Sequence, residues 1–518
     1  MPKVIFTREN QTIQAELGES VLSASRRAGI IIDSPCNGSG SCGKCKVKIG
    51  GETVLACQVA VGDTDVVVET IAHKDTSGLK ILSSGTALEV DIQPPVIQDL
   101  GLGDDSAVYG AAVDIGTTTL VVSLVNLRTG EELASSSSLN PQARHAQDVL
   151  SRITFASSAE GLELMRSEVI QEINRLIRES ASKSSVSLTD IHEAVFSGNS
   201  TMVYLAIGEP PAPLGKFPYT LTMRGGDTHP AARHGIEISP KGRIYVPPLI
   251  SAYVGADITS GILVTELSKL KGTTLFIDIG TNGEMSLARD GVLTATSTAA
   301  GPAFEGMNIS CGMRAAPGAV ERVVLTDDGV DIQTIGGGQA VGICGSGLLD
   351  AVGEIARCHV IDASGRFVKS GHAWERLIGN EGGKPSFTLS QSPGNASGIY
   401  LSQKDIRQVQ LAKSAVRAGI ELMLSSLGLK PSEVDRVLIA GSFGYHLREA
   451  SLLNIGLLPP EFAGKITFSG NTSKTGAIAF LLNGETRKDM EALAGKINVV
   501  ELANSPDFQK VFVQSMRF

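Results

Sequence analysis

The tetrapeptide Asp-Ile-Gly-Thr occurs twice in this chain of 518 residues, at residues 114–117 and again 164 residues later, at 278–281. Each copy follows an apolar run typical of a buried β-strand, so each aspartate enters a tight turn where a strand ends. Glycine and hydroxyl residues in such a turn can present backbone N–H groups to phosphate oxygens. One such turn is common, but two copies at this spacing predict a duplicated phosphate-binding fold.

The residues of the two turns suggest how a phosphate compound is held. We expect Asp114 and Asp278 to bind Mg²⁺ directly or through water, because this ion prefers oxygen ligands. The other expected phosphate contacts come from the turns themselves: Gly116, Thr117, Thr118, Gly280, Thr281 and Asn282. A later apolar strand, in residues 436–445, ends in a turn containing Gly441, Ser442 and Gly444, where a flat ring can approach the backbone.

Two phosphate turns and a late strand with a glycine turn resemble the ATPase core of acetate and sugar kinases, heat-shock proteins and actin, the ASKHA superfamily. The resemblance covers about residues 107–500. It implies an α/β fold of two lobes with duplicated sheets that clamp Mg·ATP between them. It also implies that the glycine turn at Gly441, Ser442 and Gly444 lies against the adenosine.

Three further residues are candidates for the same site. Asp257 begins a predicted helix and either orients the attacking water, as an acidic residue does in similar ATPases, or caps the helix. Glu305 lies in a glycine-bounded turn and either faces the nucleotide or the partner, or has no chemical role. Lys413, in a predicted helix over residues 404–424, either reaches the adenosine side or lies on a solvated face.

Four cysteines near the N-terminus have the spacing C-x5-C-x2-C-x11-C; they are Cys36, Cys42, Cys45 and Cys57. A [2Fe–2S] cluster needs four thiolates, and the glycines among them allow a loop to fold over the cluster. A structural zinc site is the alternative, although zinc ribbons usually carry two C-x2-C pairs. Disulfides are disfavoured because the chain opens without the features of a secretory leader, so we expect a cytoplasmic protein.

Short strands are predicted around these cysteines at residues 3–7, 12–17, 46–49 and 65–69, with a helix at 19–28. This order resembles a β-grasp [2Fe–2S] ferredoxin. We therefore expect a ferredoxin-like domain at 1–80, a linker at 81–106 with a strand at 87–92, and two ASKHA lobes at 107–270 and 271–518.

Composition limits the possible partners. The net charge is −9, which disfavours binding to a phosphate backbone, and we expect no nucleic-acid partner. No apolar run reaches 18 residues, so we also expect no membrane span. The hydrophobic content of 42% is ample for the two to four domains that a chain of this length suggests.

Segments between the motifs resemble a narrower family, the reductive activators of corrinoid proteins. They are FSGNSTM (196–202), YVGAD (253–257), AAGPAFEGM (299–307), GICGSGLLD (342–350) and SGNTSKTGA (469–477). This resemblance implies ATP-dependent transfer of one electron from the [2Fe–2S] cluster to an inactive Co(II) corrinoid protein, restoring Co(I) for methyl transfer. It also implies an upstream low-potential donor and a possible homodimer. Longer members carry an additional middle domain, for which only about 25–35 residues are present here.

Three other functions are compatible with the sequence. The protein could activate another low-potential enzyme, such as a dehydratase, although those activators share one [4Fe–4S] cluster between two subunits. It could be a small-molecule kinase with a ferredoxin sensor, which needs a substrate pocket and a base. It could also be a chaperone-like nucleotide switch that delivers cobalamin, which predicts activity without the four cysteines.

Overall fold

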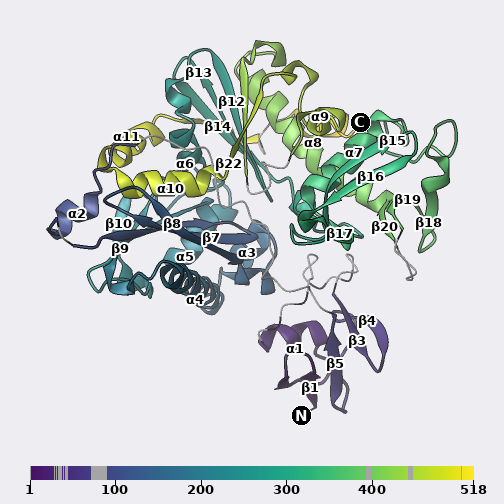
Figure 1. The fold of residues 1–518 in the computed structure, drawn as a ribbon, viewed down its shortest axis with the longest axis horizontal. Helices are drawn as coiled ribbons and strands as arrows, with labels where there is room; N and C mark the ends of the chain where they lie inside the picture. The colour runs from purple at the N-terminus through teal and green to yellow at the C-terminus, as the bar shows by residue number, and fades with distance from the viewer. Residues whose placement is uncertain are drawn as a thin grey trace.

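The computed structural model describes the chain apart from residues 1, 29, 31, 33–37, 39, 41–44, 72–89, 105, 392–397, 442–446 and 503–504. Its N-terminal unit, purple in Figure 1, is a five-stranded mixed sheet in the order β2-β1-β5-β3-β4 with one helix, α1 (Val21–Arg27). The strands are β1 (Lys3–Phe6), β2 (Gln11–Gln14), β3 (Lys46–Ile49), β4 (Glu52–Leu55) and β5 (Val66–Thr70). This is the predicted β-grasp, with β4 as the strand that the sequence did not predict.

Local sequence explains why this small unit folds. Helix α1 begins after Ser20, whose hydroxyl accepts a hydrogen bond from the N–H of Ser23, as an N-cap should. Alternate residues of β1 and β5 point into a core that includes Val4, Phe6 and Val68. Strand β1 pairs in parallel with β5, so the first and last strands lie at the centre of the sheet.

Part of the predicted linker is folded. Helix α2 (Pro95–Leu100) lies within it. A strand was expected at residues 87–92, but residues 90–92 do not form one, and residues 87–89 lie outside the described part. The N–H of Gln93 donates to the Leu482 carbonyl at 2.7 Å, and Val96 is fully buried. The chain is therefore fixed to the larger body from about Val90 onward.

That body contains two six-stranded sheets with the same central topology. The first has the order β10-β11-β9-β6-β7-β8, and the second β22-β21-β12-β13-β14-β23. Strands β6 and β12 each lead into an Asp-Ile-Gly-Thr turn, pair antiparallel with the next strand, and pair in parallel with a later one. The duplication predicted from the sequence is therefore present in the topology.

The bounds of these strands are as follows. The first sheet contains β6 (Tyr109–Ile115), β7 (Thr119–Asn126), β8 (Glu132–Leu139), β9 (Ile191–Gly198), β10 (Asp227–Pro230) and β11 (Arg243–Val246). The second contains β12 (Thr273–Ile279), β13 (Gly283–Arg289), β14 (Val292–Thr298), β21 (Arg436–Ala440), β22 (Ile466–Gly470) and β23 (Asn498–Val499).

Two helices pack between the sheets, α6 (Ala256–Val264) and α10 (Thr472–Leu482). Helix α10, yellow in Figure 1, comes from near the C-terminus but packs on β6 and β9 of the first sheet. The two helices approach closely at Gly476, where a Cβ would lie 2.4 Å from the Cβ of Ser260. One apolar cluster joins Ala112 of the first sheet to Phe276 of the second through these helices.

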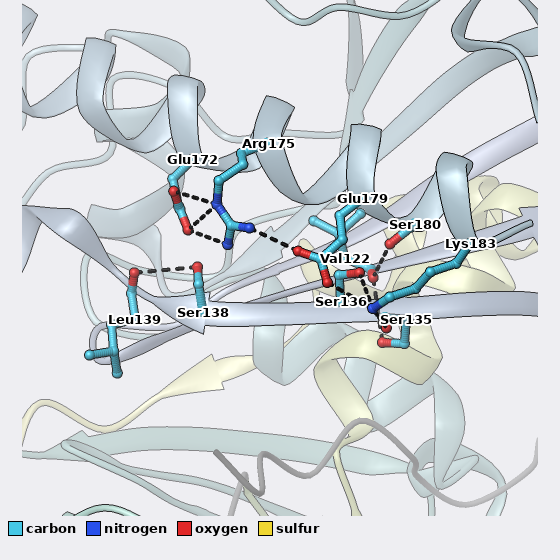
Figure 2. A network of polar contacts seen from close by, with 10 residues as sticks. All are labelled: Val122, Ser135, Ser136, Ser138, Leu139, Glu172, Arg175, Glu179, Ser180 and Lys183. Atoms are coloured by element: carbon cyan, nitrogen blue, oxygen red, sulfur yellow. Dashed lines mark hydrogen bonds and ion pairs between the residues drawn. The ribbon is translucent and has the colours of Figure 1, made fainter. Parts of the chain in front are cut away.

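Other helices cover the first sheet: α3 (Val149–Phe155), α4 (Ala159–Lys183) and α5 (Ser200–Ile207). Figure 2 shows charged side chains of α4 lying along the serine run of β8 at residues 135–138. Lys183 Nζ is 2.7 Å from Glu179 and 3.0 Å from the Ser136 hydroxyl. Exposed i,i+4 pairs such as Glu179–Lys183 contribute only about 0.3–0.5 kcal/mol each.

The second half also contains α8 (Gln403–Ser426), predicted for residues 404–424, which packs on the second sheet, α7 (Gly345–Arg357), which packs on β15 (Ala319–Thr326), and α9 (Glu449–Asn454), which packs on α7. Two small sheets extend this half, to the right in Figure 1. They are built from β15, β16 (Gly329–Thr334) and β17 (Gly342–Ile343), and from β18 (Ile378–Glu381), β19 (Lys384–Ser390) and β20 (Ile399–Ser402). Helices α11 (Gly484–Ala494) and α12 (Phe508–Gln514) complete the chain, and within the described residues no helix is long and apolar enough to cross a membrane.

Candidate functional site

The two Asp-Ile-Gly-Thr turns face each other across a narrow cleft. Its lining includes Asp114, Gly116, Thr117, Thr118, Asp257, Asp278, Gly280, Thr281, Asn282, Glu305 and Gly441, which the sequence predicted. It also includes Asn199, Glu284, Asn471 and Ser473, which the sequence did not predict as site residues. The structure thus brings together most of the predicted site, while Ser442 and Gly444 lie outside the described residues.

The turns are matched in detail. The Gly116 N–H donates to the Thr119 carbonyl at 2.9 Å, and the Gly280 N–H donates to the Asn282 carbonyl at the same distance. Beside each turn, a glycine with positive φ lies at the end of a parallel strand: Gly198 is the last residue of β9, with φ of +156°, and Gly441 directly follows β21, with φ of +121°. A Cβ at either glycine would lie 2.4–2.5 Å from the carbonyl oxygen of the isoleucine in the turn. The segment FSGNSTM is therefore the first-sheet counterpart of the glycine turn that follows β21.

Four carboxyl groups lie around the cleft: Glu284 is buried, and Asp114, Asp257 and Asp278 are half-buried. Burial, followed by the charges of Asp257 and Asp114, raises the pKa of Asp278 to about 8. Burial and the charge of Asp114 raise the pKa of Asp257 to about 7. Glu284 pairs with Asp278 across β12 and β13, and burial raises its pKa well above the usual value. Such a set retains protons until a cation compensates its charge.

The same carboxyl groups fit a magnesium ion that takes most of its ligands from elsewhere. Within the described part of the chain, no three acidic, histidine or cysteine side chains are placed to hold a metal ion by themselves. Mg²⁺ commonly binds one or two carboxylates and completes its shell with water and substrate phosphates. The donor set therefore suits a metal that enters together with a nucleotide.

Asp114 is held by the helix that returns from the C-terminal part of the chain. Asn471 Nδ2 donates to its Oδ2 at 2.8 Å, and Ser473 Oγ donates to its Oδ1 at 2.7 Å. These two bonds lower the pKa of Asp114, but burial outweighs them and the pKa is raised overall. Asn471 is also the N-cap of α10, because its Oδ1 accepts from the N–H of Lys474 at 2.9 Å. One residue thus both starts the helix and orients the aspartate.

A second layer of residues fixes the first phosphate turn from behind. Asn140 is fully buried, and its Nδ2 donates to the Gly116 carbonyl at 2.8 Å while its own N–H donates to the Thr118 carbonyl at 2.9 Å. Arg152 is also fully buried, and its Nη2 donates to the Thr117 carbonyl at 2.6 Å. Three consecutive carbonyls of the turn are therefore bonded from one side, which leaves its opposite side for the ligand.

Substitution of Asn140 by aspartate is expected to loosen this turn. The new carboxylate can still accept from the Gln142 N–H, but it replaces the donor to Gly116 with a charge facing a carbonyl oxygen. We expect a loss of about 1–3 kcal/mol in unfolding free energy, measured by denaturant titration. The conservative exposed change Asn380→Asp is the control, and an unchanged Asn140→Asp protein would show that the turn does not depend on this donor.

Glu305 connects the two turns directly. Its carboxylate accepts hydrogen bonds from Thr118 Oγ1 of the first turn and from Thr281 Oγ1 of the second, the latter at 2.6 Å. The two hydroxyl oxygens are 3.4 Å apart. Of the two alternatives left open by the sequence, the structure therefore favours a residue that faces the cleft.

The structure also answers the questions about Asp257 and Lys413. Helix α6 is capped at Gly255, so Asp257 is not the N-cap; its Oδ1 accepts from the Ile258 N–H at 2.8 Å and it lines the cleft. Lys413 does not line the cleft and is not on a solvated face: it is fully buried, donates to the Arg517 carbonyl, and lies over the Phe518 ring at 5.1 Å. Burial lowers its pKa to about 7.

Two of the four N-terminal cysteines can be placed, because Cys36 and Cys42 lie outside the described residues. The Sγ atoms of Cys45 and Cys57 are 3.2 Å apart. Sulfurs bound at about 2.3 Å to one tetrahedral metal ion lie roughly 3.8 Å apart, so this pair fits a shared ion with a small adjustment. Burial raises the pKa of the Cys45 thiol to about 11, so its thiolate needs a metal to compensate the charge.

Comparison with known protein families accounts for most of the chain. Residues 4–65 match the 2Fe-2S iron-sulfur cluster binding domain. Residues 109–270 match the middle region of RACo, and residues 272–518 match its C-terminal domain, described as the ASKHA domain. The middle region of the family is therefore the segment built on the first sheet, and the expectation that only about 25–35 residues stand in its place was wrong.

Whole-chain relatives give the same result. The chain is 30% identical to the corrinoid activation enzyme RamQ of Eubacterium limosum, over 100% of this chain and 99% of the relative. It is 25% identical to a [Co(II) methylated amine-specific corrinoid protein] reductase of Methanosarcina barkeri, over 79% and 77%. A solved reductive activator for corrinoid, iron-sulfur protein superposes with a TM-score of 0.75 at 30% identity, covering 100% of this chain and 98% of that one. The chain therefore belongs to the family of the reductive activators of corrinoid proteins.

Proposed function

We propose that this protein is an ATP-dependent reductive activator, which delivers one electron to an inactive Co(II) corrinoid protein and restores the Co(I) state used in methyl transfer. The observation that carries the proposal is the union, in one chain, of a ferredoxin-like unit and a cleft with two facing phosphate turns. Relatives that match over their whole length are named for corrinoid activation and reductive activation.

The difference in reduction potential between the cluster and Co(I) explains why the electron carrier needs a nucleotide. When bound, a [2Fe–2S] cluster supplies the electron, and plant-type centres have potentials near roughly −400 mV. Co(I) forms only at much lower potential, and each 100 mV of deficit costs about 2.3 kcal/mol per electron. Nucleotide binding can offset this cost only by favouring one conformation or one redox state of the complex.

The geometry suggests how the cleft converts a nucleotide into movement. Its phosphate turns end strands of two different sheets, so a nucleotide held by both fixes the distance between the sheets. We assign Asp114 and Asp278 to Mg²⁺ and phosphate, and Asp257 to the attacking water. Gly116, Thr117, Thr118, Gly280, Thr281 and Asn282 form the phosphate turns, and Gly441, Ser442 and Gly444 the adenosine side.

The proposal also includes the cluster ligands, the domain limits and the electron donor. Cys36, Cys42, Cys45 and Cys57 hold the cluster. We propose a ferredoxin-like domain at 1–80, a connection at 81–106 and lobes at 107–270 and 271–518, in a cytoplasmic protein that receives its electron from an upstream low-potential donor and forms a homodimer.

The test is to reduce the purified protein, mix it with a Co(II) corrinoid protein, and follow the cobalt absorbance with and without Mg·ATP. We expect Co(I), or methyl-Co(III) when a methyl donor is present, to form only with Mg·ATP. Equal reduction without the nucleotide would contradict the coupling. Phosphate transfer to a small molecule would identify a kinase instead.

A further inference from the structure

Glu305 stands where the two halves of the cleft meet. It is the last residue of the short helix η7 (Pro302–Glu305), which follows β14 of the second sheet. One carboxylate oxygen accepts from Thr118, in the turn between β6 and β7, and the other accepts from Thr281, in the turn between β12 and β13. A single side chain therefore joins the two halves through the turns that we assign to phosphate.

The contacts of Glu305 are those expected of a phosphate group. Like the edge of a phosphate, its carboxylate presents two negatively charged oxygens to hydroxyl donors on both turns. The space left in the cleft is about 90 Å³, whereas pockets for ligands of drug size occupy about 300–1,000 Å³. A triphosphate cannot enter this space unless the turns separate, and separation breaks at least one bond of Glu305.

Charge makes the carboxylate and a phosphate mutually exclusive. Arg152, buried behind the first turn, donates to uncharged acceptors: the carbonyls of Thr117 and Ala146, the Gln142 amide oxygen and the Met202 sulfur. The charge of Glu305 is among those that act on this buried guanidinium. An anion between the turns therefore helps to compensate Arg152, but two anions there would repel each other.

The segment that contains Glu305 packs closely against α7 and α8, so a shift of this segment also shifts these helices. Phe304 is fully buried, and a Cβ at Gly345, the first residue of α7, would lie 1.7 Å from the Phe304 carbonyl oxygen. Gly301 and Gly306 flank the segment with φ near +77°, a conformation available to glycine at little cost. Helix η7 also contacts α8. Movement of Glu305 therefore moves the start of α7.

We propose that Glu305 is a latch that closes the empty cleft and is displaced by the terminal phosphate of a nucleoside triphosphate. The inference rests on the proposed nucleotide binding and adds a competitor for that phosphate within the chain. In the nucleotide-free protein the latch holds the turns together. When the triphosphate enters, its terminal phosphate accepts the hydrogen bonds of the Thr118 and Thr281 hydroxyls. The displaced segment then shifts α7 and α8.

The test is calorimetric titration of Glu305→Gln with Mg²⁺ and either the triphosphate analogue AMP-PNP or ADP. Glutamine keeps the size of the side chain but removes the competing charge. We expect AMP-PNP to bind about tenfold more tightly than to the wild type, as loss of one competing charge-assisted interaction implies, with a smaller change for ADP. The control is Glu461→Gln, which makes the same change in net charge at an exposed position.

Other results would contradict the latch. Weaker binding of AMP-PNP by Glu305→Gln would show that Glu305 is a ligand of the nucleotide or its metal, and equal binding would show that it does not compete. Hydrogen exchange of the wild-type protein provides a test that does not depend on the variant: AMP-PNP should accelerate exchange in residues 302–307, and unchanged or slower exchange counts against the latch. If wild-type protein binds no AMP-PNP, the proposed nucleotide function itself has failed.

Discussion

Replacement of Asp278 by asparagine is expected to lower the ATP-dependent rate of Co(II) reduction by about 100-fold or more. The carboxyl group is half-buried at the end of β12 beside Asp114 and Asp257, where a divalent cation and phosphate are expected to complete the charge balance. Asparagine keeps the shape but cannot supply that charge, and loss of one electrostatic contact at a reacting phosphate typically costs this much. The iron–sulfur absorbance should be unchanged, because the cysteines are in a separate unit.

Asp290, in the second sheet like Asp278, provides a matched control. Asp290 is exposed at the turn between β13 and β14 with φ of +50°, a conformation that asparagine also tolerates. Asp290→Asn should therefore retain the wild-type rate with Mg·ATP. If Asp278→Asn were as active as this control, the assignment of the phosphate turns would be wrong.

The stability of Asp278→Asn provides a second readout in the same experiment. The pKa of Asp278 is raised to about 8 in the folded protein, against an ordinary value near 3.9, so the folded state binds the extra proton between these limits. The contribution of Asp278 to the free energy of unfolding is therefore fully present at low pH and is lost as the pH rises from about 4 to 8. In the absence of nucleotide, the free energy of unfolding of Asp278→Asn should rise relative to that of the wild type by up to about 1.4 kcal/mol per pH unit across that window. Denaturant titration at several pH values measures this difference.

Replacement of Cys57 by serine is expected to abolish electron transfer while leaving nucleotide binding intact. The Cys57 and Cys45 sulfurs are 3.2 Å apart, and serine offers a poor ligand to iron at this position. We expect the visible absorbance of the cluster to fall by most of its wild-type value and Co(II) reduction to fall below detection. Binding of AMP-PNP should stay within about twofold of the wild type, since the cleft lies in the other unit.

Cys358→Ser is the control for this experiment, because Cys358 is a half-buried cysteine at the C-cap of α7 in the ATPase part of the chain. That variant should keep both absorbance and reduction. If the wild-type protein carried stoichiometric zinc and no visible chromophore, the iron–sulfur assignment would be wrong. Full activity of Cys57→Ser would favour the cobalamin-delivering switch over electron transfer.

The parts of the site that could be predicted are those with a local cause. A strand followed by Asp-Ile-Gly-Thr specifies a turn by itself, and its repetition specifies a second sheet, so the structure has a turn at both predicted positions. The β-grasp strands likewise follow from short alternating patterns. Strand β4 was missed because Gly50 and Gly51 separate it from β3 by a turn, which reads as loop in the sequence.

The parts that could not be predicted depend on contacts between distant segments. Asn471 meets Asp114 from 357 positions away, and Asn140 reaches Gly116 from a stretch that has no phosphate-binding pattern. Lys413 was misplaced because a lysine on an amphipathic helix usually faces water, whereas here the C-terminal residues Arg517 and Phe518 cover it. Within the predicted linker, the residues just before α2 are held by Leu482 and Asn483, which no local signal connects to them.

The position of α10 has a consequence for synthesis on the ribosome. The first sheet is complete in sequence by Val246, yet its aspartate is oriented by Asn471 and Ser473, and its face is covered by a helix that ends at Leu482. Domains generally fold as they emerge, N-terminal segments first. The nascent chain must therefore grow by more than 200 further residues before its first Asp-Ile-Gly-Thr turn acquires this support, so incomplete chains cannot assemble the whole cleft.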